Sequence, residues 1–355
     1  MRSLLLCSLL VLPGALSYAM QAASTAATSG SGQGVRVTPN VAQQRVDITI
    51  DGKPFTSYLW PTTQKKAVLF PLIASNGVTV TRGFPMEPRP GERVDHPHHA
   101  GLWFNYGNVN GFDFWNNSDA IPAARSSKMG TVHDVEILSS KSGKDSGELV
   151  TEATWTSGAG QDILKQHTRY VFSRIGDARS IDTIVTLHAL QHAVFNDDKE
   201  GLLGMRVAHF LESPTEKGGI FNDANGVPAK TADAAPGATG VYLTSEGVKG
   251  DAVWATRGRW CTLTGTDADG KTVAIAIIDH PGNPGYPTYW HARGYGLFAA
   301  NPLGRSIFDP KAPPFDFTID QGSDATFRYR VILFPTSTTP AAINHQADTF
   351  ASEYR

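Results

Sequence analysis

The strongest constraint on the fold of this chain is an alternation of apolar and polar residues that recurs from about residue 45 onwards. The stretches VDITIDGKPFTSYLW, ELVTEATWTS, HTRYVFSRIG and SIDTIVTLHAL all show it, and Gly, Ser and Asp residues bound them. Successive side chains of a strand point to opposite faces, so the pattern predicts strands with a buried face. The pairs Asp51-Gly52 and Asp269-Gly270 lie between such stretches and predict two hairpin turns.

A convincing helix signal occurs near the C-terminus, in STTPAAINHQADTFASEY. Thr339 can cap a helix there and Pro340 suits its first position, which predicts a helix over 339–353. Short strands with turn signals about every 8–12 residues are typical of a sandwich or barrel. We therefore predict an all-β fold, a single large antiparallel β-sandwich over residues 35–355 with one C-terminal helix.

The first residues are typical of a secretory signal peptide. Arg2 supplies a positive charge, an apolar run follows, and Ser17 and Ala19 suit a cleavage site, which predicts a signal peptide over 1–19. A membrane anchor is the alternative, but the run is short and Pro13 and Gly14 interrupt it. Residues 20–34 hold mostly Ala, Ser, Gly and Thr and predict a flexible linker. We expect a periplasmic or secreted protein with no membrane partner after cleavage.

Charge and motif content exclude several functions. The formal net charge is −2 and Lys and Arg are scattered, which argues against nucleic acid as a partner. After signal cleavage Cys261 is the one remaining cysteine, so no intramolecular disulfide is expected. The chain has no glycine-rich dinucleotide or phosphate loop and no Gly-x-Ser-x-Gly motif, which argues against a nicotinamide, ATP or serine-elbow enzyme.

The triplet Asp-His-Pro occurs twice, at residues 95–97 and 279–281, each time in a segment rich in Pro, Gly, Asn and aromatic residues. Long ordered loops on a β scaffold usually carry function. In each triplet the aspartate can fix one imidazole nitrogen and leave the other free to act. We predict that the two loops meet across one cleft, although Asp and Pro are also ordinary turn residues.

Three histidines follow Asp95 within four residues, as His96, His98 and His99. On an extended chain His96 and His98 point to one side, which suits two ligands of a divalent metal, with His291 as a third. General acid–base catalysis without a metal is a second interpretation, and histidines that only shape the loop are a third. The candidate catalytic residues are Asp95, His96, His98, His99, Asp279, His280 and His291.

Aromatic rings, amides, carboxylates and arginines accompany the histidines in both loops and in the strand-like segment LLGMRVAHFLESP. Flat rings can cover the C–H faces of a sugar while amides and guanidinium groups bind its oxygens. The same rings could form a local core. The candidate substrate-binding residues are Arg82, Trp103, Asn105, Asn110, Asp113, Trp115, Arg206, Tyr289, Trp290, Arg293 and Asn301.

The segments DHPHHAGLWF, GNVNGFDFW, LLGMRVAHFLESP and DHPGNPGYPTYWHARGYGLFAANPLG resemble the PmoA-like family of bacterial secreted proteins, whose domain has no known function. The resemblance covers residues 40–335. That family carries the name of a methane oxygenase subunit, an integral membrane protein, which does not suit a chain without a spanning segment after its signal. More distantly, the chain is similar to the galactose mutarotase supersandwich. That resemblance implies proton transfer at a sugar ring, but the catalytic glutamate of that fold has no clear counterpart here.

Together these features predict a secreted carbohydrate-active enzyme that performs acid–base chemistry at a sugar ring. The reaction is glycoside hydrolysis, elimination or epimerisation, with oxidised keto-sugars included among the substrates. A non-catalytic carbohydrate-binding protein and a metalloenzyme with oxidative chemistry are the alternatives. No cofactor is certain from the sequence, and a divalent metal ion is left open.

Overall fold

The computed structural model describes residues 33–223, 225–233 and 236–354. Their framework is two eight-stranded sheets in which every strand pair is antiparallel. The predicted signal peptide and nearly all of the predicted linker lie outside the described residues. The domain boundaries and the export of the protein stay predictions.

The first sheet has the spatial order β1 (Val35–Asn40), β2 (Arg45–Ile50), β3 (Lys53–Leu59), β4 (Val68–Leu69), β5 (Leu102–Phe104), β11 (Leu203–Arg206), β18 (Leu297–Asn301) and β17 (Tyr289–Arg293). The second has the order β14 (Val241–Thr244), β15 (Trp260–Thr266), β16 (Thr272–Asp279), β20 (Asp324–Phe334), β9 (Ala178–Ala189), β8 (Asp162–Ile175), β7 (Ser146–Ser157) and β6 (Gly130–Lys141). Two ribbons pair β10 (Ala193–Phe195) with β19 (Phe317–Ile319) and β12 (Lys217–Asn222) with β13 (Pro228–Asp233).

The predicted all-β sandwich is confirmed. Alternate residues of both sheets, such as Ile48 in β2, Phe172 in β8 and Val185 in β9, meet in one large buried core. The hairpin turns also lie where the sequence predicts them, with Asp51 and Gly52 between β2 and β3 and Gly270 between β15 and β16. The period-two alternation therefore predicted both where the strands lie and which of their faces are buried.

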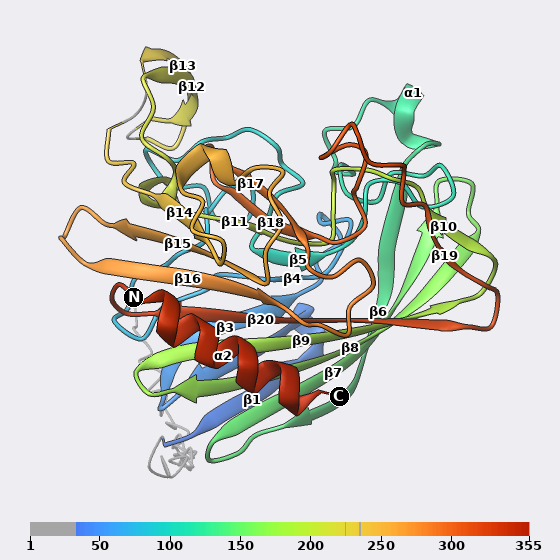
Figure 1. Cartoon of the computed structure of the whole chain (residues 1–355), viewed down its shortest axis with the longest axis horizontal. Helices are drawn as coiled ribbons and strands as arrows, with labels where there is room; N and C mark the ends of the chain where they lie inside the picture. The colour runs from blue at the N-terminus through green and yellow to red at the C-terminus, as the bar shows by residue number, and fades with distance from the viewer. Residues whose placement is uncertain (1–32, 224, 234–235, 355) are drawn as a thin grey trace, which may run out of the picture. The chain divides into compact units, whose positions relative to one another are not determined.

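The predicted C-terminal helix is α2 (Pro340–Glu353), and the Thr339 hydroxyl caps it by accepting a hydrogen bond from the Ala342 N–H at 3.3 Å. Its apolar face packs on the outer side of the second sheet, where Phe350 lies against a cluster that includes Trp260 and Ile278 (Figure 1). The sequence did not predict α1 (Ala123–Ser126) or the 3-10 turns η1 (Val41–Gln43), η2 (His209–Leu211) and η3 (Gly250–Val253). No helix among the described residues is long and apolar enough to cross a membrane.

The outer face of the first sheet carries a third buried cluster, which includes Trp103, Trp115, Leu297 and Ala299. The residues that alternate with them in β5, β11, β18 and β17 point into the main core. Segments far apart in the sequence therefore display side chains side by side on this outer face. Most of the candidate site residues lie on or above it.

Candidate functional site

Two rows of side chains cross the outer face of the first sheet. Strand register places Gly204 of β11 opposite both Trp103 and Ala299, and Ala299 opposite His291. In the next row Leu297 lies opposite Arg206 and opposite Arg293. A β-carbon on Gly204 would approach within 2.6 Å of the Trp115 ring and 2.7 Å of the Trp103 ring. The absence of a side chain at Gly204 therefore lets the two indoles pack against this strand.

The loop over residues 93–99 is organised from within by one arginine. The Arg82 guanidinium is fully buried and donates to the backbone carbonyls of Arg93, Asp95, His96 and His99 at 3.2, 2.8, 3.0 and 3.0 Å. It also binds the Asp95 carboxylate at 2.8 Å. Arg82 is predicted as a substrate-binding residue, and the structure corrects this, because the guanidinium is fully buried and both of its Nη groups donate to the loop.

A second buried arginine holds the same carboxylate. Arg206 reaches Asp95 Oδ1 at 2.6 Å, and its side chain is fully buried while that of Asp95 is 30% exposed. Burial alone raises the pKa of Asp95, but the hydrogen bond from His96 and the charges of Arg206 and Arg82 outweigh it. The pKa of Asp95 therefore falls well below its usual range, and the carboxylate is ionised.

The ionised carboxylate lies beside an exposed imidazole. His96 Nδ1 is 3.4 Å from Asp95 Oδ1, and the His96 side chain is 41% exposed. Its backbone has a φ of +45°, a left-handed conformation that is rare for a residue with a β-carbon. On one side its ring is parallel to that of Tyr295, with centroids 5.2 Å apart, and on the other to that of His99, at 4.9 Å.

The other two histidines of the loop are buried and neutral. Burial is the main cause that lowers the pKa of His98 to about 2 and the pKa of His99 well below its normal value. Trp115 Nε1 and Arg206 Nη1 approach the two ring nitrogens of His99 at 3.2 and 3.3 Å. A neutral imidazole accepts at one nitrogen only, so these two donors compete for it. His96 is the loop histidine that a solute can reach.

Tyr295 joins the histidine loop to a cavity of about 620 Å3. The Arg206 guanidinium lies 4.9 Å from the Tyr295 ring centroid, and burial raises the pKa of the Tyr295 phenol to about 12. Across the cavity the exposed Arg293 stacks on Trp254 at 5.4 Å, and Asp251 accepts a hydrogen bond from the Ser213 hydroxyl at 3.0 Å. Rings, a guanidinium and a carboxylate thus line one open space.

Asp279 and His280 do not join this site. Asp279 Oδ1 accepts from Asn283 at 2.7 Å and Oδ2 from the Thr288 N–H at 2.8 Å, and burial raises its pKa to about 7. The His280 ring packs on Phe350 of α2 with centroids 5.2 Å apart and accepts the Gly282 N–H at 3.0 Å. Both residues stabilise a turn at the end of β16 in the second sheet. The two Asp-His-Pro triplets themselves therefore do not share a cleft.

The far end of that second loop does reach the first, through Tyr295. His291, in contrast, is buried against Phe308, with centroids 5.9 Å apart, and burial lowers its pKa to about 3. Among the described residues, no three His, Cys, Asp or Glu side chains gather as a metal site would require. The proposed ligands His96, His98 and His291 therefore do not assemble, and the structure gives the metal hypothesis no support.

The predicted amide and carboxylate ligands of a sugar serve the scaffold instead. Asn105 donates to the Phe114 carbonyl at 2.5 Å, and Asn110 spans to the His192 carbonyl and the Val194 N–H. Asp113 caps the turn at Asn116, and Asn301 accepts the N–H groups of Leu303 and Gly304. The prediction that these residues bind substrate is therefore corrected for Asn105, Asn110, Asp113 and Asn301. Their local turn chemistry was a sufficient reason for their presence.

The predicted stacking rings are buried as well. Trp290 is 0% exposed and faces the core between the sheets, because it alternates with the outward-facing His291. Trp103 and Trp115 form the floor beneath His99, and Tyr289 packs on Phe308 at 5.2 Å. These four rings cannot stack on a ligand without rearrangement, which corrects the prediction.

Sequence reasoning missed Tyr295, Trp254, Asp251 and Ser213. Tyr295 lies two residues after the predicted Arg293, at the turn that joins β17 to β18, and an aromatic at the tip of a hairpin was a usable signal. The other three come from the segment between η2 and β15, which carries no histidine and no repeated motif. Ser213 does belong to the segment LLGMRVAHFLESP that the sequence analysis singled out, whereas nothing in the local sequence marked Trp254 or Asp251.

The fold and site define a two-sheet antiparallel β-sandwich that presents an Asp–His pair, held by two buried arginines, on the outer face of one sheet. The chain belongs to the Family of unknown function (DUF6807), whose model matches residues 45–348. No curated protein matches the chain in sequence. The resemblance to the PmoA-like family stays a prediction.

Solved structures with some likeness include the following three. A galactose mutarotase-like protein from Clostridium acetobutylicum is 11% identical with a TM-score of 0.39, covering 86% of this chain and 100% of that one. Galactose 1-epimerase from Lactobacillus acidophilus is 10% identical with a TM-score of 0.39, and the match covers 85% of this chain and 98% of that one. An alpha-galactosidase from Geobacillus stearothermophilus is 11% identical with a TM-score of 0.40, and the match covers 85% of this chain and 41% of that one. These values are too low to transfer an activity or a site residue.

Proposed function

We propose that this protein is a carbohydrate-active enzyme in which His96 transfers a proton at a sugar ring. One observation carries the proposal: an ionised Asp95, fixed by the buried Arg82 and Arg206, contacts Nδ1 of the exposed His96. Burying two guanidinium groups around one carboxylate has a high desolvation cost and is a poor route to stability. Such an arrangement, together with the left-handed backbone at His96, is typical of a functional site.

The geometry assigns a role to each group. Asp95 accepts a hydrogen bond from Nδ1–H of His96, which leaves Nε2 to take a proton from a sugar hydroxyl or carbon, or to give one to a glycosidic oxygen. When the imidazole becomes positively charged, the neighbouring carboxylate stabilises it, as in other Asp–His pairs. Arg82 and Arg206 are positioning residues in this scheme, because they hold Asp95 ionised and in place.

The cavity beside Tyr295 supplies binding groups for a sugar. The Tyr295 phenol keeps its proton at neutral pH and can donate to a substrate oxygen. Arg293 presents donors at the surface, and Asp251 and Ser213 can accept hydroxyl groups. Trp254 and Tyr295 add ring surface. Proton transfer at His96 suits hydrolysis, elimination and epimerisation, and it suits keto-sugars because a carbonyl acidifies the neighbouring C–H.

A substrate panel with matched variants tests the proposal. Purified protein is incubated with glycosides and keto-glycosides, and products are followed by NMR. His96→Gln keeps the size of the side chain and should lower kcat/KM by about a hundredfold or more, with the unfolding midpoint unchanged. The control is His188→Gln, because His188 forms a similar exposed pair with Asp324 at 2.7 Å on the other sheet, and it should have wild-type activity.

Two results would overturn the proposed function. Sugar binding without turnover across the panel would make the protein a carbohydrate-binding protein. Turnover that depends on a metal found by elemental analysis, and that survives His96→Gln, would favour the metalloenzyme alternative.

We propose in addition that the protein is exported, since residues 1–19 have the composition of a signal peptide. Sequencing the N-terminus of the mature protein from its producing cell tests this, with a start near residue 20 expected. An intact Met1 in the cytoplasmic fraction would refute it.

A further inference from the structure

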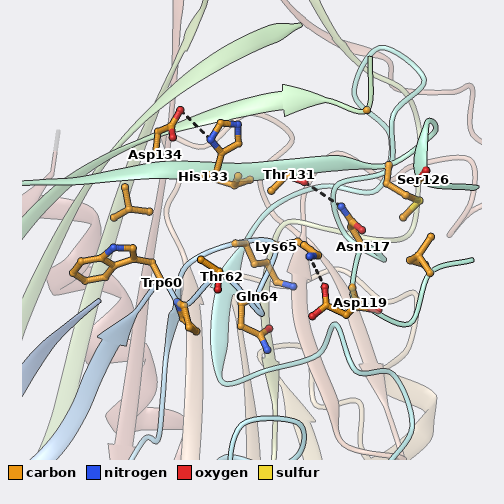
Figure 2. A pocket seen from close by; sticks show the side chains of 18 of the residues that line it. Trp60, Thr62, Gln64, Lys65, Asn117, Asp119, Ser126, Thr131, His133 and Asp134 are labelled. Carbon is orange, nitrogen blue, oxygen red and sulfur yellow. Dashed lines mark hydrogen bonds and ion pairs between the residues drawn. The ribbon is translucent and has the colours of Figure 1, made fainter. Parts of the chain in front are cut away.

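A second cleft lies between the chain that follows β3 and the edge strand β6 of the second sheet. Its volume is about 780 Å3. Figure 2 shows three segments that form its walls: residues 60–65, residues 117–119 and the start of β6 around Thr131–Asp134. None of the residues that line it belongs to the cavity beside Tyr295.

Direct hydrogen bonds tie these three walls together. The Val132 N–H donates to the Lys65 carbonyl at 2.8 Å, which fixes the first segment to β6. Asn117 Nδ2 donates to the Gly130 carbonyl at 2.8 Å and to the Thr131 hydroxyl at 3.2 Å, which fixes the second segment to the same strand. An ion pair of 2.5 Å between Lys65 and Asp119 closes the remaining side. The cleft is therefore formed before any ligand arrives.

The lining combines one large ring with unpaired amides. Trp60 is half-buried and lines the cleft, and its ring rests on Tyr58 at a centroid distance of 5.6 Å and a tilt of 42°. The side chains of Gln44, Gln64 and Thr62 make no hydrogen bond to any described residue. A ring beside free amide and hydroxyl groups matches the apolar face and the hydroxyl edge of a sugar.

The charges of the cleft exclude other ligand classes. Lys65 is neutralised by Asp119, and Lys66 is buried with its ammonium donating to the His98 carbonyl at 2.6 Å. No arginine lines the cleft, so a phosphate or a sugar acid would find no free cation. The exposed Asp134, paired with His133 at 2.9 Å, adds negative charge that repels anions further. An apolar ligand would leave the amides unpaired.

We propose that this cleft is a second carbohydrate-binding site, which holds a neutral oligosaccharide with one ring stacked on Trp60. Gln64 and Gln44 would bind hydroxyl groups of the stacked unit, and Asn117 and the free oxygen of Asp119 those of a neighbouring unit. This site performs no chemistry. It is independent of the activity proposed at His96, because it shares no lining residue with that cavity.

Titration calorimetry and Trp fluorescence test the site with defined probes: cellohexaose, xylohexaose, maltohexaose and mannohexaose, with inorganic phosphate as an anionic control. At least one hexasaccharide should bind and phosphate should not. Trp60→Ala should weaken binding by about tenfold or more, and Trp60→Phe by less because a ring remains. Gln64→Ala should weaken binding about threefold or more, and the Gln64 side chain makes no hydrogen bond to any described residue that the substitution would remove.

Matched variants separate the two sites. His96→Gln and Trp254→Ala should leave hexasaccharide affinity at the cleft unchanged, and Trp60→Ala should leave turnover of a monosaccharide glycoside unchanged. The proposal is overturned if no hexasaccharide binds, if binding survives both Trp60→Ala and Gln64→Ala, or if His96→Gln abolishes it. Failure of the proposed activity alone, with binding still dependent on Trp60, leaves the second site standing.

Discussion

Replacement of Asp95 by asparagine tests the central feature of the candidate site. The carboxylate pairs with two guanidinium groups that are both fully buried, and it is 2.8 Å from Arg82 and 2.6 Å from Arg206. Asn has the same shape and can still accept hydrogen bonds, so Asp95→Asn removes the charge and little else. The substitution leaves the buried guanidinium groups of Arg82 and Arg206 without the negative charge that both contact.

The structure sets the expected size of the effect. Removing one partner of a buried ion pair costs about 3–5 kcal/mol. Arg82 retains its four backbone carbonyl acceptors, and the Asp95 side chain is 30% exposed, which both reduce the loss. Arg206 has His99 as its other polar contact and loses more. We therefore expect Asp95→Asn to lower the free energy of unfolding by about 2–3 kcal/mol at neutral pH.

The pH dependence gives the same substitution a second readout. Because the pKa of Asp95 is lowered in the folded state, its contribution is fully present above the pKa of the unfolded chain, about 3.9. It is lost as pH falls through the folded-state pKa. The difference between wild type and Asp95→Asn should therefore be constant from about pH 5 to pH 8 and shrink below about pH 4.

Urea unfolding followed by fluorescence at several pH values measures both quantities. The control is Asp348→Asn, since Asp348 is 68% exposed and pairs with Arg259 at the surface at 2.7 Å. That exposed pair should contribute about 0–1 kcal/mol. Losses for the two variants that agree within about 0.5 kcal/mol would refute the view that Asp95 holds two buried cations.

Two further predictions concern the floor of the site. Gly204→Ala should lower the free energy of unfolding by about 1–3 kcal/mol, because its β-carbon would lie 2.6 Å from the Trp115 ring; urea unfolding with no loss would show that the indoles can shift. Burial lowers the pKa of Lys66 to about 7, so the unfolded chain binds more protons than the folded one above that pH. Between pH 7 and pH 9 wild type should therefore gain about 1–2 kcal/mol of stability relative to Lys66→Met, and a constant difference would contradict this.

The strands could be predicted from the sequence because period-two alternation is a local property. The terminal helix could be predicted for the same reason, since Thr339 and Pro340 mark its start within one turn. The pairing of β5 with β11 and of β11 with β18 could not, because it joins residues about a hundred positions apart. The site depends on that pairing, which brings Arg206 beneath the histidine loop.

The sequence could select polar residues as candidates for the site, but it predicted less well what each of their side chains binds. Arg82 and Asn301 were correctly singled out as unusual, but both satisfy backbone groups of loops that other parts of the chain position. Whether a guanidinium faces a ligand or a carbonyl depends on a loop conformation that alternation does not encode. His96 was one of seven candidate catalytic residues, and the sequence did not distinguish it from His98 or His280, because exposure and contact with an ionised carboxylate depend on the fold.

The two Asp-His-Pro triplets show how surroundings separate function from turn chemistry, and they support a final prediction. Two guanidinium groups keep Asp95 ionised beside an exposed His96, whereas Asp279 is held by an amide and an N–H and His280 packs on Phe350. His280→Ala should therefore lower the free energy of unfolding by about 1–2 kcal/mol, because the ring contact and the bond from the Gly282 N–H are lost. Its turnover should stay within about twofold of wild type, while His96→Ala should reduce turnover about a hundredfold with little change in stability. Measuring both quantities for both variants decides the matter: if His280→Ala reduces turnover as much as His96→Ala does, the second triplet acts in catalysis and its packing beneath α2 is not its role.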